Sequence, residues 1–399
     1  MADYSDLEAG TYATLETDTY FLLEGAQVRQ VSLQVTFAGV VLTNVIQARG
    51  EVSADTGWPT CSVFVTAKPP TGNEEDDISV VAGAGNNVTR FTGKVRRFRP
   101  SGFPKSIEMV CSGTLAYAAE WAPVLAGSTD IAYRFGVSGD FPDGSQGFFP
   151  SGGTDQDIVR WVLDQVPGIS YFAGDIGGTG TTLGLSAPRS FDWKNGATAW
   201  SYIQQLDRAT LYRTYQARDG TIYRVQMIGH PDNTADFTLG PQDILQGASG
   251  DRNTEQTRNN LRVLGHDYGV GVGPVQGTAT ATPIPGVPDR WEMFSSDLIE
   301  DGNDPLGAAY GLAGLNADTL ADQILPDVNK EFVEASIPSW RDDTHGPGMT
   351  CLLDALDRLA IGEPMWVARH AWEVGDNGWM ATYGLTGGGL QQTNPAPPV

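Results

Sequence analysis

Alternating apolar and polar residues in the first hundred positions constrain the fold of this chain most. Residues 28–52 read VRQVSLQVTFAGVVLTNVIQARGEV, and this period of two, rich in β-branched residues, is typical of strands that bury one face. The segments WPTCSVFVTA (58–67) and NNVTRFTGKVRRFRP (86–100) continue the pattern. A further strand leads to Thr114, which precedes a short helical segment. We therefore predict a mostly β domain over residues 1–122.

Helical spacing marks the middle of the chain. Thr154 and Asp157 form a capping-box pattern at the start of one helix, and a second helix is predicted from about residue 196. A hairpin follows, with its turn at Asp219-Gly220. These elements predict an α+β unit. The apolar positions of the two helices are Ile158, Trp161, Val162 and Val166, then Trp200, Ile203 and Leu206.

The last third again combines strands and helices. Residues 257–283 are strand-rich, whereas the spacing of leucine, isoleucine and valine predicts helices over 316–332 and 349–359. A closing hairpin is expected with its turn at residues 375–378. The chain should therefore end in a second β-rich domain with helical insertions.

A chain of 399 residues exceeds the usual size of one hydrophobic core, so several domains are expected. After the first domain, we place an α+β domain at 123–235, the second β domain at 236–390 and a disordered tail at 391–399. The fold class is predicted to be β-rich α+β.

The charge balance argues against nucleic-acid recognition. The chain carries 25 basic and 48 acidic residues, and a net charge of −23 repels phosphate. The amino terminus, MADYSDLEAG, has no signal-peptide pattern, and no apolar run is long enough to span a membrane. We expect synthesis in a cytoplasm, no stable membrane insertion and no sequence-specific nucleic-acid binding. Cys61, Cys111 and Cys351 lack a CxxC arrangement and are interpreted as reduced core residues.

Motifs for catalysis are missing. The four histidines form no zinc-binding pattern, and no GxSxG sequence occurs. Asp342, Asp343 and His345 lie together in SWRDDTHGPG, but without a nucleophile motif. We predict that the chain is not an enzyme, with no catalytic residue and no bound cofactor.

Two loops leave calcium binding open. Oxygen-bearing side chains occur at calcium-like spacing in GDRNTEQ and in SGDFPDGSQG, yet neither segment has the full order of an EF-hand loop. Solvated loops are the favoured interpretation of both segments. The side chains concerned are Asp251, Asn253 and Glu255 in the first, and Asp140 and Asp143 in the second.

One basic cluster stands out in this acidic chain. Lys94, Arg96, Arg97 and Arg99 lie in KVRRFRP, and strand alternation places at least two of them on one face. One interpretation is a solvated edge strand whose charges discourage aggregation. The other is a contact with an acidic neighbouring subunit. The sequence does not decide between them.

The order of several short segments resembles the baseplate hub proteins of phage tails. The first β domain, from VSLQVTF through FTGKV to VCSGTLAYA, resembles the first barrel of that family. WKNGATAWSYIQQLDRATLYRTYQARDGTIY is similar to the inserted α/β unit of the family. FTLGPQDILQG and TRNNLRVLG resemble the strands that re-enter a barrel. ADTLADQILPDVNKEF and EPMWVARHAWEV resemble the late helix and closing strands, so the similarity covers about residues 30–390.

The resemblance implies a structural role in a virion. Such hubs are trimers in which each chain supplies two tail-tube-like β-barrels, so that a pseudo-hexameric ring joins a hexameric tail tube to a trimeric spike or fibre. The implied partners are two further copies of this chain, the tail tube protein, distal tail or baseplate proteins, the spike or fibre and the tape-measure protein. DNA would pass only in transit through an acidic channel. A tail-associated protein that binds or hydrolyses glycans remains the alternative.

Overall fold

The computed structural model describes most of the chain between residues 31 and 387. The described ranges are 31–69, 71–83, 87–101, 106–121, 132–135, 148–149, 154–180, 189–192, 198–227, 234–253, 257–267, 273–281, 288–296, 299–301, 315–329, 332–341, 344–354, 364–375 and 378–387. Strands outnumber helices within these ranges, so the predicted β-rich α+β class is confirmed. The predicted tail at 391–399 lies outside the described residues.

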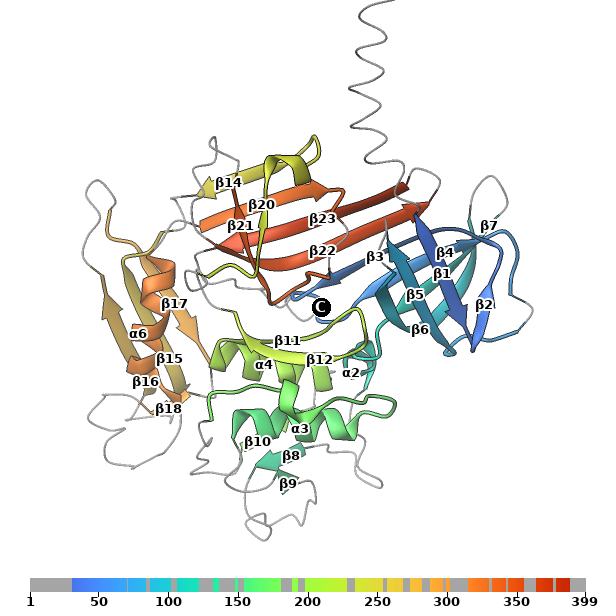
Figure 1. The fold of residues 1–399 in the computed structure, drawn as a ribbon. Helices are drawn as coiled ribbons and strands as arrows, with labels where there is room; N and C mark the ends of the chain where they lie inside the picture. Colours follow the sequence, from blue (N-terminus) through green and yellow to red (C-terminus); the bar gives the residue numbers. More distant parts are fainter. Residues whose placement is uncertain are drawn as a thin grey trace, which may run out of the picture.

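One large sheet organises the molecule. Its early strands are β1 (Ser32–Phe37), β2 (Val40–Leu42), β3 (Val45–Ser53), β4 (Thr60–Val65), β5 (Asp77–Gly83), β6 (Val88–Ser101) and β7 (Ser106–Ser112). Its late strands are β13 (Phe237–Leu239), β14 (Ser249–Asn253), β20 (Phe332–Ser339), β21 (Thr350–Leu353), β22 (Met365–Gly375) and β23 (Gly378–Gly387). The 13 strands follow the order β14-β20-β23-β22-β3-β4-β7-β6-β5-β1-β2, with β21 beside β22 and β13 beside β21 (Figure 1).

This sheet unites the two ends of the sequence. The second half of β22 pairs antiparallel with β3, from Arg369 opposite Ser53 to Val374 opposite Ala48. Among the described strands the hydrogen-bonded path stays open and ends at β14 and β2. The two separate β-barrels expected from the resemblance are therefore not detected. In a closed barrel, both edges of β3 would pair with strands of the same domain. Here one edge of β3 pairs with β4, and the other edge pairs with β22 from the far end of the chain.

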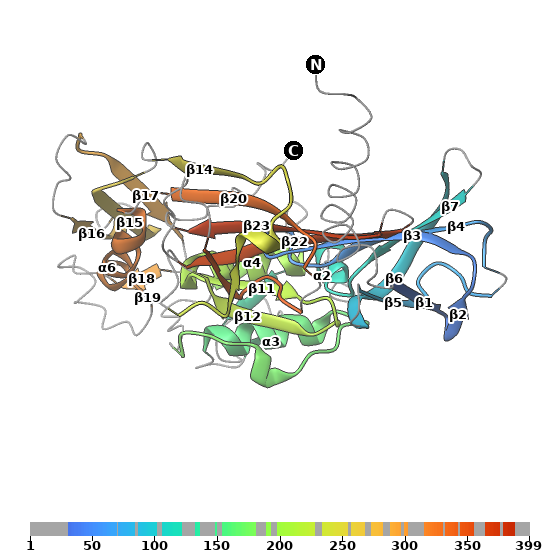
Figure 2. The same ribbon diagram turned by 45° about the horizontal axis from the view of Figure 1, so that its top comes forward.

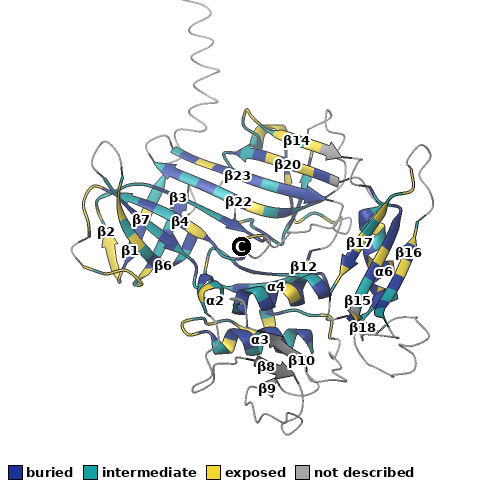
Figure 3. Ribbon diagram, turned by 180° about the vertical axis from the view of Figure 1, so that it is seen from behind, coloured by how far each residue is buried: buried dark blue, intermediate teal, exposed yellow. Residues whose placement is uncertain are grey.

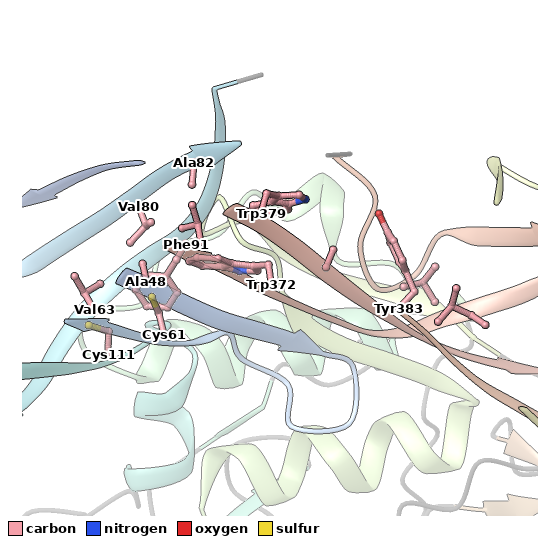
Figure 4. Close-up of a cluster of buried hydrophobic side chains, with 14 of the residues drawn as sticks. Ala48, Cys61, Val63, Val80, Ala82, Phe91, Cys111, Trp372, Trp379 and Tyr383 are labelled. Carbon is pink, nitrogen blue, oxygen red and sulfur yellow. The ribbon is translucent and has the colours of Figure 1, made fainter. Parts of the chain in front are cut away.

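The inner face of this sheet carries a continuous apolar core (Figure 4). Cys61 and Cys111 lie directly opposite each other on β4 and β7, and both thiols are free and buried. Trp372 lies on this face beside Gly50, where an added Cβ would come within 2.7 Å of the indole and 2.8 Å of the Thr60 carbonyl oxygen. A glycine is therefore needed where the tryptophan crosses β3.

The middle of the chain forms the predicted α+β unit below the sheet (Figure 1). Thr154 caps α3 (Asp155–Gln165) through a capping box with Asp157, as predicted, and α4 (Ala199–Thr210) begins with a similar box at Thr198. The predicted hairpin is β11 (Tyr212–Gln216) and β12 (Ile222–Gln226). The smaller elements are α2 (Ala116–Glu120), β8 (Ala132–Phe135), β9 (Phe148–Phe149), η1 (Ala173–Asp175) and β10 (Arg189–Asp192). A further short helix, η2 (Pro241–Asp243), lies beside the end of β20, where Ser339 Oγ donates to the Asp243 carbonyl at 2.7 Å.

A buried ion cluster joins these elements. Arg224 on β12 is fully buried and donates hydrogen bonds to Asp155 on α3 and Asp207 on α4, each at 2.7 Å. It also donates to the Thr210 hydroxyl at 2.6 Å and to the Gly177 carbonyl at 2.8 Å. Burial alone would lower the pKa of Arg224, but Asp207 and Asp155 raise it above its ordinary value. The cluster fixes two helices against one hairpin.

A single amide side chain connects the α+β unit to the sheet. Gln216 is buried at the end of β11; its Oε1 accepts from the Leu115 backbone N–H, and its Nε2 donates to Thr114 Oγ1, both at 3.0 Å. Its own backbone N–H donates to the Gly57 carbonyl at 2.7 Å. Because buried polar groups need partners, Gln216 sets where the hairpin lies against the loops that end β3 and β7.

A third group of elements lies at the far end of the molecule from β1–β7 in both Figures 1 and 2. Three strands are ordered β16-β15-β17, and α6 (Ala317–Val328) packs on them. The helix confirms the prediction for residues 316–332 over most of its length. The strands are β15 (Asn260–Asp267), β16 (Pro274–Thr280) and β17 (Trp291–Ser295), with the short pair β18 (Ile299–Asp301) and β19 (Leu315–Asn316).

Two further predictions have opposite outcomes. The closing hairpin is confirmed, because β22 and β23 pair up to Gly375 opposite Gly378. The helix predicted over residues 349–359 is wrong for residues 350–353, which form β21. Pairing with β13 and β22 overrides the local leucine spacing there. Within the described part of the chain, no helix has the length and apolarity needed to cross a membrane.

Candidate subunit interface

The predicted basic cluster lies in the second half of β6, where a β-bulge changes the strand alternation. Lys94 pairs with Ser112 on β7 and Val95 with Cys111, but the next partner, Val110, lies opposite Arg97. Arg96 is the extra residue of the bulge. The bulge brings Lys94, Arg97 and Arg99 onto the outer face of the sheet, opposite the face that carries the core.

Most of these cations have partners within the chain. Lys94 Nζ lies 2.7 Å from the Asp77 carboxylate, and Arg99 pairs with Glu108 in the sheet. Glu108 is almost fully buried and accepts a further hydrogen bond from Ser62 at 2.7 Å. Burial would raise the pKa of Glu108, but the hydrogen bonds from Arg99 and Ser62 hold it below its ordinary value.

Arg96 anchors a small cluster at the start of the α+β unit. Its guanidinium donates to Glu120 on α2 at 2.6 Å and to Glu75 at 3.2 Å, and it lies 5.0 Å from the Tyr117 ring centroid. Burial and the hydrogen bond to Glu75 raise the pKa of Tyr117 to about 12. Arg96 is therefore used inside the chain, and the sequence did not predict Glu120 as its partner.

Arg97 differs from the other three. It is exposed on the outer face and makes no ion pair with any described residue. Of the four predicted residues, it is the one whose charge is available to another molecule.

A trough of about 470 Å³ lies beside this strand on the outer face. Its floor is β3, β4 and β7, and its far wall is β22 and β23, where Met380 is 45% exposed. Two polar pairs border it: Arg369 donates to Glu51 and Gln47 to Glu373, both at 2.6 Å. Other lining residues are Arg49, Gly50, Thr60, Cys61, Ser62, Arg96, Val110, Cys111, Ser112, Ala371, Trp372 and Thr382.

Both ends of the large sheet have an unpaired edge among the described strands. At one end, Val40 and Val41 on β2 are each 49% exposed, and Figure 3 shows β2 coloured as exposed. At the other end lies β14. On the third group, Trp291 and Met293 on β17 are 57% and 59% exposed. Exposed apolar edges of this kind are surfaces that proteins normally cover.

The calcium alternative receives no support from the described residues. Asp251 and Asn253 lie in β14, paired with Glu334 and Phe332 of β20, and not in a loop. The described residues contain no group of three acidic, histidine or cysteine side chains that could hold a metal. Glu255, Asp140 and Asp143 lie outside them.

Comparison by sequence finds no relative. No protein-family model matches the chain, and no curated protein matches it. The fold, in contrast, has clear counterparts.

Three solved structures match nearly the whole chain. A tail protein from Neisseria meningitidis MC58 aligns with a TM-score of 0.57 at 10% identity, over 90% of this chain and 96% of that protein. The 43 kDa tail protein of prophage MuSo2 from Shewanella oneidensis gives 0.56 at 12% identity, over 89% and 98%. Prophage tail protein gp18 from Listeria monocytogenes EGD-e gives 0.52 at 11%, over 88% and 94%. The chain therefore has the fold of these tail proteins over about nine tenths of its length.

Proposed function

We propose that this chain is a non-enzymatic structural subunit of a phage or phage-like tail, located at the baseplate hub. The observation that carries the proposal is the near-complete mutual coverage with three tail proteins. If only a catalytic or binding domain were shared, the alignment would cover only a part of each chain. The alignments instead cover about nine tenths of this chain and more than nine tenths of each tail protein. The virion location, at the tail tip or baseplate, follows from the same proposal.

The proposed assembly is a homotrimer that forms a pseudo-hexameric ring. Two parts of the large sheet, β1–β7 and β20–β23, would act as the two tail-tube-like units of each chain, and together with the α+β unit they correspond to the proposed domains 1–122, 123–235 and 236–390. Contacts between copies would cover the open edges at β2 and β14. A closed cyclic interface would then stop growth at a fixed number of chains.

The proposed partners follow from this position. The ring would join the tail tube protein above to distal baseplate proteins and a spike or fibre below, with the tape-measure protein and DNA passing through it. The net charge of −23 suits a channel for a polyanion, because a lumen of like charge does not retain it.

The outer face around Arg97 and the trough is the surface we assign to a neighbouring acidic subunit. Arg97 offers a charge that is not used within the described chain, and the trough beside it combines an exposed Met380 with paired charges at its border.

A glycan-binding function remains the alternative, and its feature would be an exposed aromatic platform. The sequence predicted Trp161 and Trp200 as core residues; Trp200 is buried, and Trp161 packs against the same core. Among the described aromatic side chains, Phe172 is 71% exposed and Trp291 57%, and Trp291 is the one that a glycan test should replace first.

The test is the mass and symmetry of the assembled protein. Light scattering of the purified chain and electron-microscopy class averages of intact tail tips should show a three-fold ring of about three chains of 42.6 kDa with an open channel. A compact monomer that is absent from tail tips would reject the proposal and direct attention to glycan-binding assays with Trp291→Ala.

The interface assignment has its own variant. Arg97→Glu should raise the dissociation constant of the ring by about tenfold or more, because it places an acidic side chain against an acidic neighbour. Lys94→Gln on the same strand is the matched control, since Lys94 already pairs with Asp77. Reversal of Arg96 or Arg99 is unsuitable because both neutralise glutamates within the chain. Normal assembly of the Arg97 variant would reject the contact while leaving the hub proposal standing.

A further inference from the structure

Two carboxylates face each other without a cation at one end of the large sheet. Asp251 on β14 lies directly opposite Glu334 on β20 in the antiparallel register, and both residues are exposed. Neither makes an ion pair with a described residue. Like charges directly opposite each other on paired strands destabilise a sheet. This acidic pair, Asp251 and Glu334, therefore weakens the chain that carries it.

The acidic pair lies on the outer face of the sheet. The neighbours of Glu334 along β20, Val333 and Ala335, are buried in the core of the inner face. Because side chains alternate along a strand, Glu334 points to the outer face, and Asp251 opposite it points the same way. β14 is also the last strand of the hydrogen-bonded path, so its second edge is unpaired among the described strands. The acidic pair is therefore accessible to a second molecule.

Arg97 is the complementary charge on the same face. It is exposed on β6, and it makes no ion pair within the described part of the chain. On the same strand, Lys94 is neutralised by Asp77, and Arg99 by Glu108. Of these three outer-face cations on β6, Arg97 alone has a charge that no described residue balances.

Arg97 and the acidic pair are too far apart to meet within one chain. The sheet order β20-β23-β22-β3-β4-β7-β6 places six strand-to-strand steps between them. At about 4.8 Å per step, the two sites lie roughly 30 Å apart across the sheet, far beyond the reach of an ion pair. β14 and β6 lie toward opposite ends of the sheet in both Figures 1 and 2. The two sites can therefore neutralise each other only between molecules.

One guanidinium can bind two carboxylates at once. Arg224 does so inside this chain, where it contacts Asp155 and Asp207 at 2.7 Å each. The planar guanidinium presents several N–H donors in fixed directions, which suits oxygens that come from two strands. Residues directly opposite each other hold their Cβ atoms about 5 Å apart, so one arginine can reach both members of the acidic pair.

We propose that Arg97 of one copy of this chain binds between Asp251 and Glu334 of the next copy. The contact identifies the acidic neighbour of Arg97, and it rests on the proposed ring. The chain itself carries both halves of the contact, so a second copy supplies the partner. Each chain offers the acidic pair to one neighbour and Arg97 to the other, which is the head-to-tail arrangement that closes into a ring.

The twist of the sheet suits such an arrangement. Adjacent strands rotate relative to one another, and β6 runs at a clear angle to β20 in Figures 1 and 2. The outer face is therefore turned in different directions at its two ends. One chain can present these ends to two different neighbours.

Exchanging the charges across the contact is the test. Arg97→Glu and Glu334→Lys should each raise the dissociation constant of the assembly by about tenfold or more, measured by sedimentation velocity over a concentration series at low salt. The double variant Arg97→Glu with Glu334→Lys again supplies one cation and two carboxylates. Its dissociation constant should return to within about threefold of the wild-type value.

The matched control is Arg97→Glu with Asp164→Lys, which has the same net charge as the double variant. Asp164 is exposed in the last turn of α3, in the α+β unit below the sheet (Figure 1). This control should assemble as weakly as Arg97→Glu alone. Folding has a control as well: Glu334→Lys places a cation opposite Asp251, so its urea midpoint should not fall below that of the wild type. A lower midpoint would contradict the unrelieved repulsion in the acidic pair.

Three results would overturn the contact. In the first, the double variant assembles as weakly as the single variants. In the second, Asp164→Lys restores assembly equally well, which would show a response to net charge alone. In the third, Glu334→Lys leaves the dissociation constant unchanged while Arg97→Glu raises it, which would assign Arg97 to another acidic partner. A wild-type chain that stays monomeric rejects the proposed ring and the contact together, whereas a wild-type ring without rescue rejects the contact alone.

Discussion

Removing the guanidinium of Arg224 should open the α+β unit. In Arg224→Met, the buried carboxyl groups of Asp155 and Asp207 would lose the cation that each contacts at 2.7 Å. Removing one partner of a buried ion pair costs about 3–5 kcal/mol, because the remaining charge is left uncompensated. Asp155 would retain hydrogen bonds from Thr179, and Asp207 one from the Thr214 N–H, so we expect a value within that range and not above it.

Hydrogen exchange in α3 and α4 is the appropriate assay, because a chain with several domains need not unfold in two states. A loss of 3–5 kcal/mol corresponds to an opening constant larger by roughly two to nearly four orders of magnitude. Arg213→Met is the matched control on the adjacent strand: its partner Asp55 is half exposed, and such pairs contribute no more than about 1 kcal/mol.

Neutralising the carboxylates should reverse part of the loss. Adding Asp155→Asn and Asp207→Asn to Arg224→Met removes the uncompensated charges and leaves only the cost of lost packing and hydrogen bonds. The reasoning is refuted if Arg224→Met opens the helices no more than Arg213→Met does, or if the triple variant is less stable than the single one.

Two other predictions concern stability and reactivity. Gln216→Leu should lower the free energy of unfolding by about 1–3 kcal/mol, seen as a lower urea midpoint, because the Leu115 N–H loses its buried acceptor. The control Gln226→Leu, on the exposed end of β12, should change that free energy by less than about 0.5 kcal/mol. Equal shifts in the two variants would contradict the role of Gln216 in joining the hairpin to the sheet. Burial raises the pKa of the Cys351 thiol to about 12 and the pKa values of Cys61 and Cys111 well above the ordinary value. A disulfide reagent at pH 8 should therefore react at least about a thousandfold more slowly with the folded chain than with the urea-unfolded chain. Rapid labelling of the folded chain would contradict this prediction.

The basic cluster shows where a sequence pattern reaches its limit. The alternation in KVRRFRP correctly indicated a strand, but the bulge at Arg96 could not be predicted because it depends on the register with β7. The intrachain partners Glu75, Glu108 and Glu120 lie up to 24 residues away in sequence. Only their positions in the folded chain separate Arg97 from its three neighbours.

Arg224 and His370 show the same limit for buried polar groups. Both lie in segments correctly predicted as strands, and neither has a local signal of burial or of its partners. Arg224 contacts Asp155, which is 69 residues away, and His370 lies opposite Val52 on β3, from the other end of the chain. The burial and the partners of such polar side chains depend on which elements pack around them, and local sequence does not determine that packing.

The sequence by itself determined most of the strands, the two helices of the α+β unit with the cap at Thr154, the two hairpins and the β-rich class, because capping boxes, turn residues and periodicity act over a few neighbouring residues. The order of its short segments also indicated the tail-protein fold that comparison of structures supports. Tertiary structure alone decided that β22 joins β3 in one open sheet, and that residues 350–353 form a strand and not a helix. Strand partners far apart in sequence are chosen by burial and edge pairing across the whole chain, and local propensity carries no information about that choice.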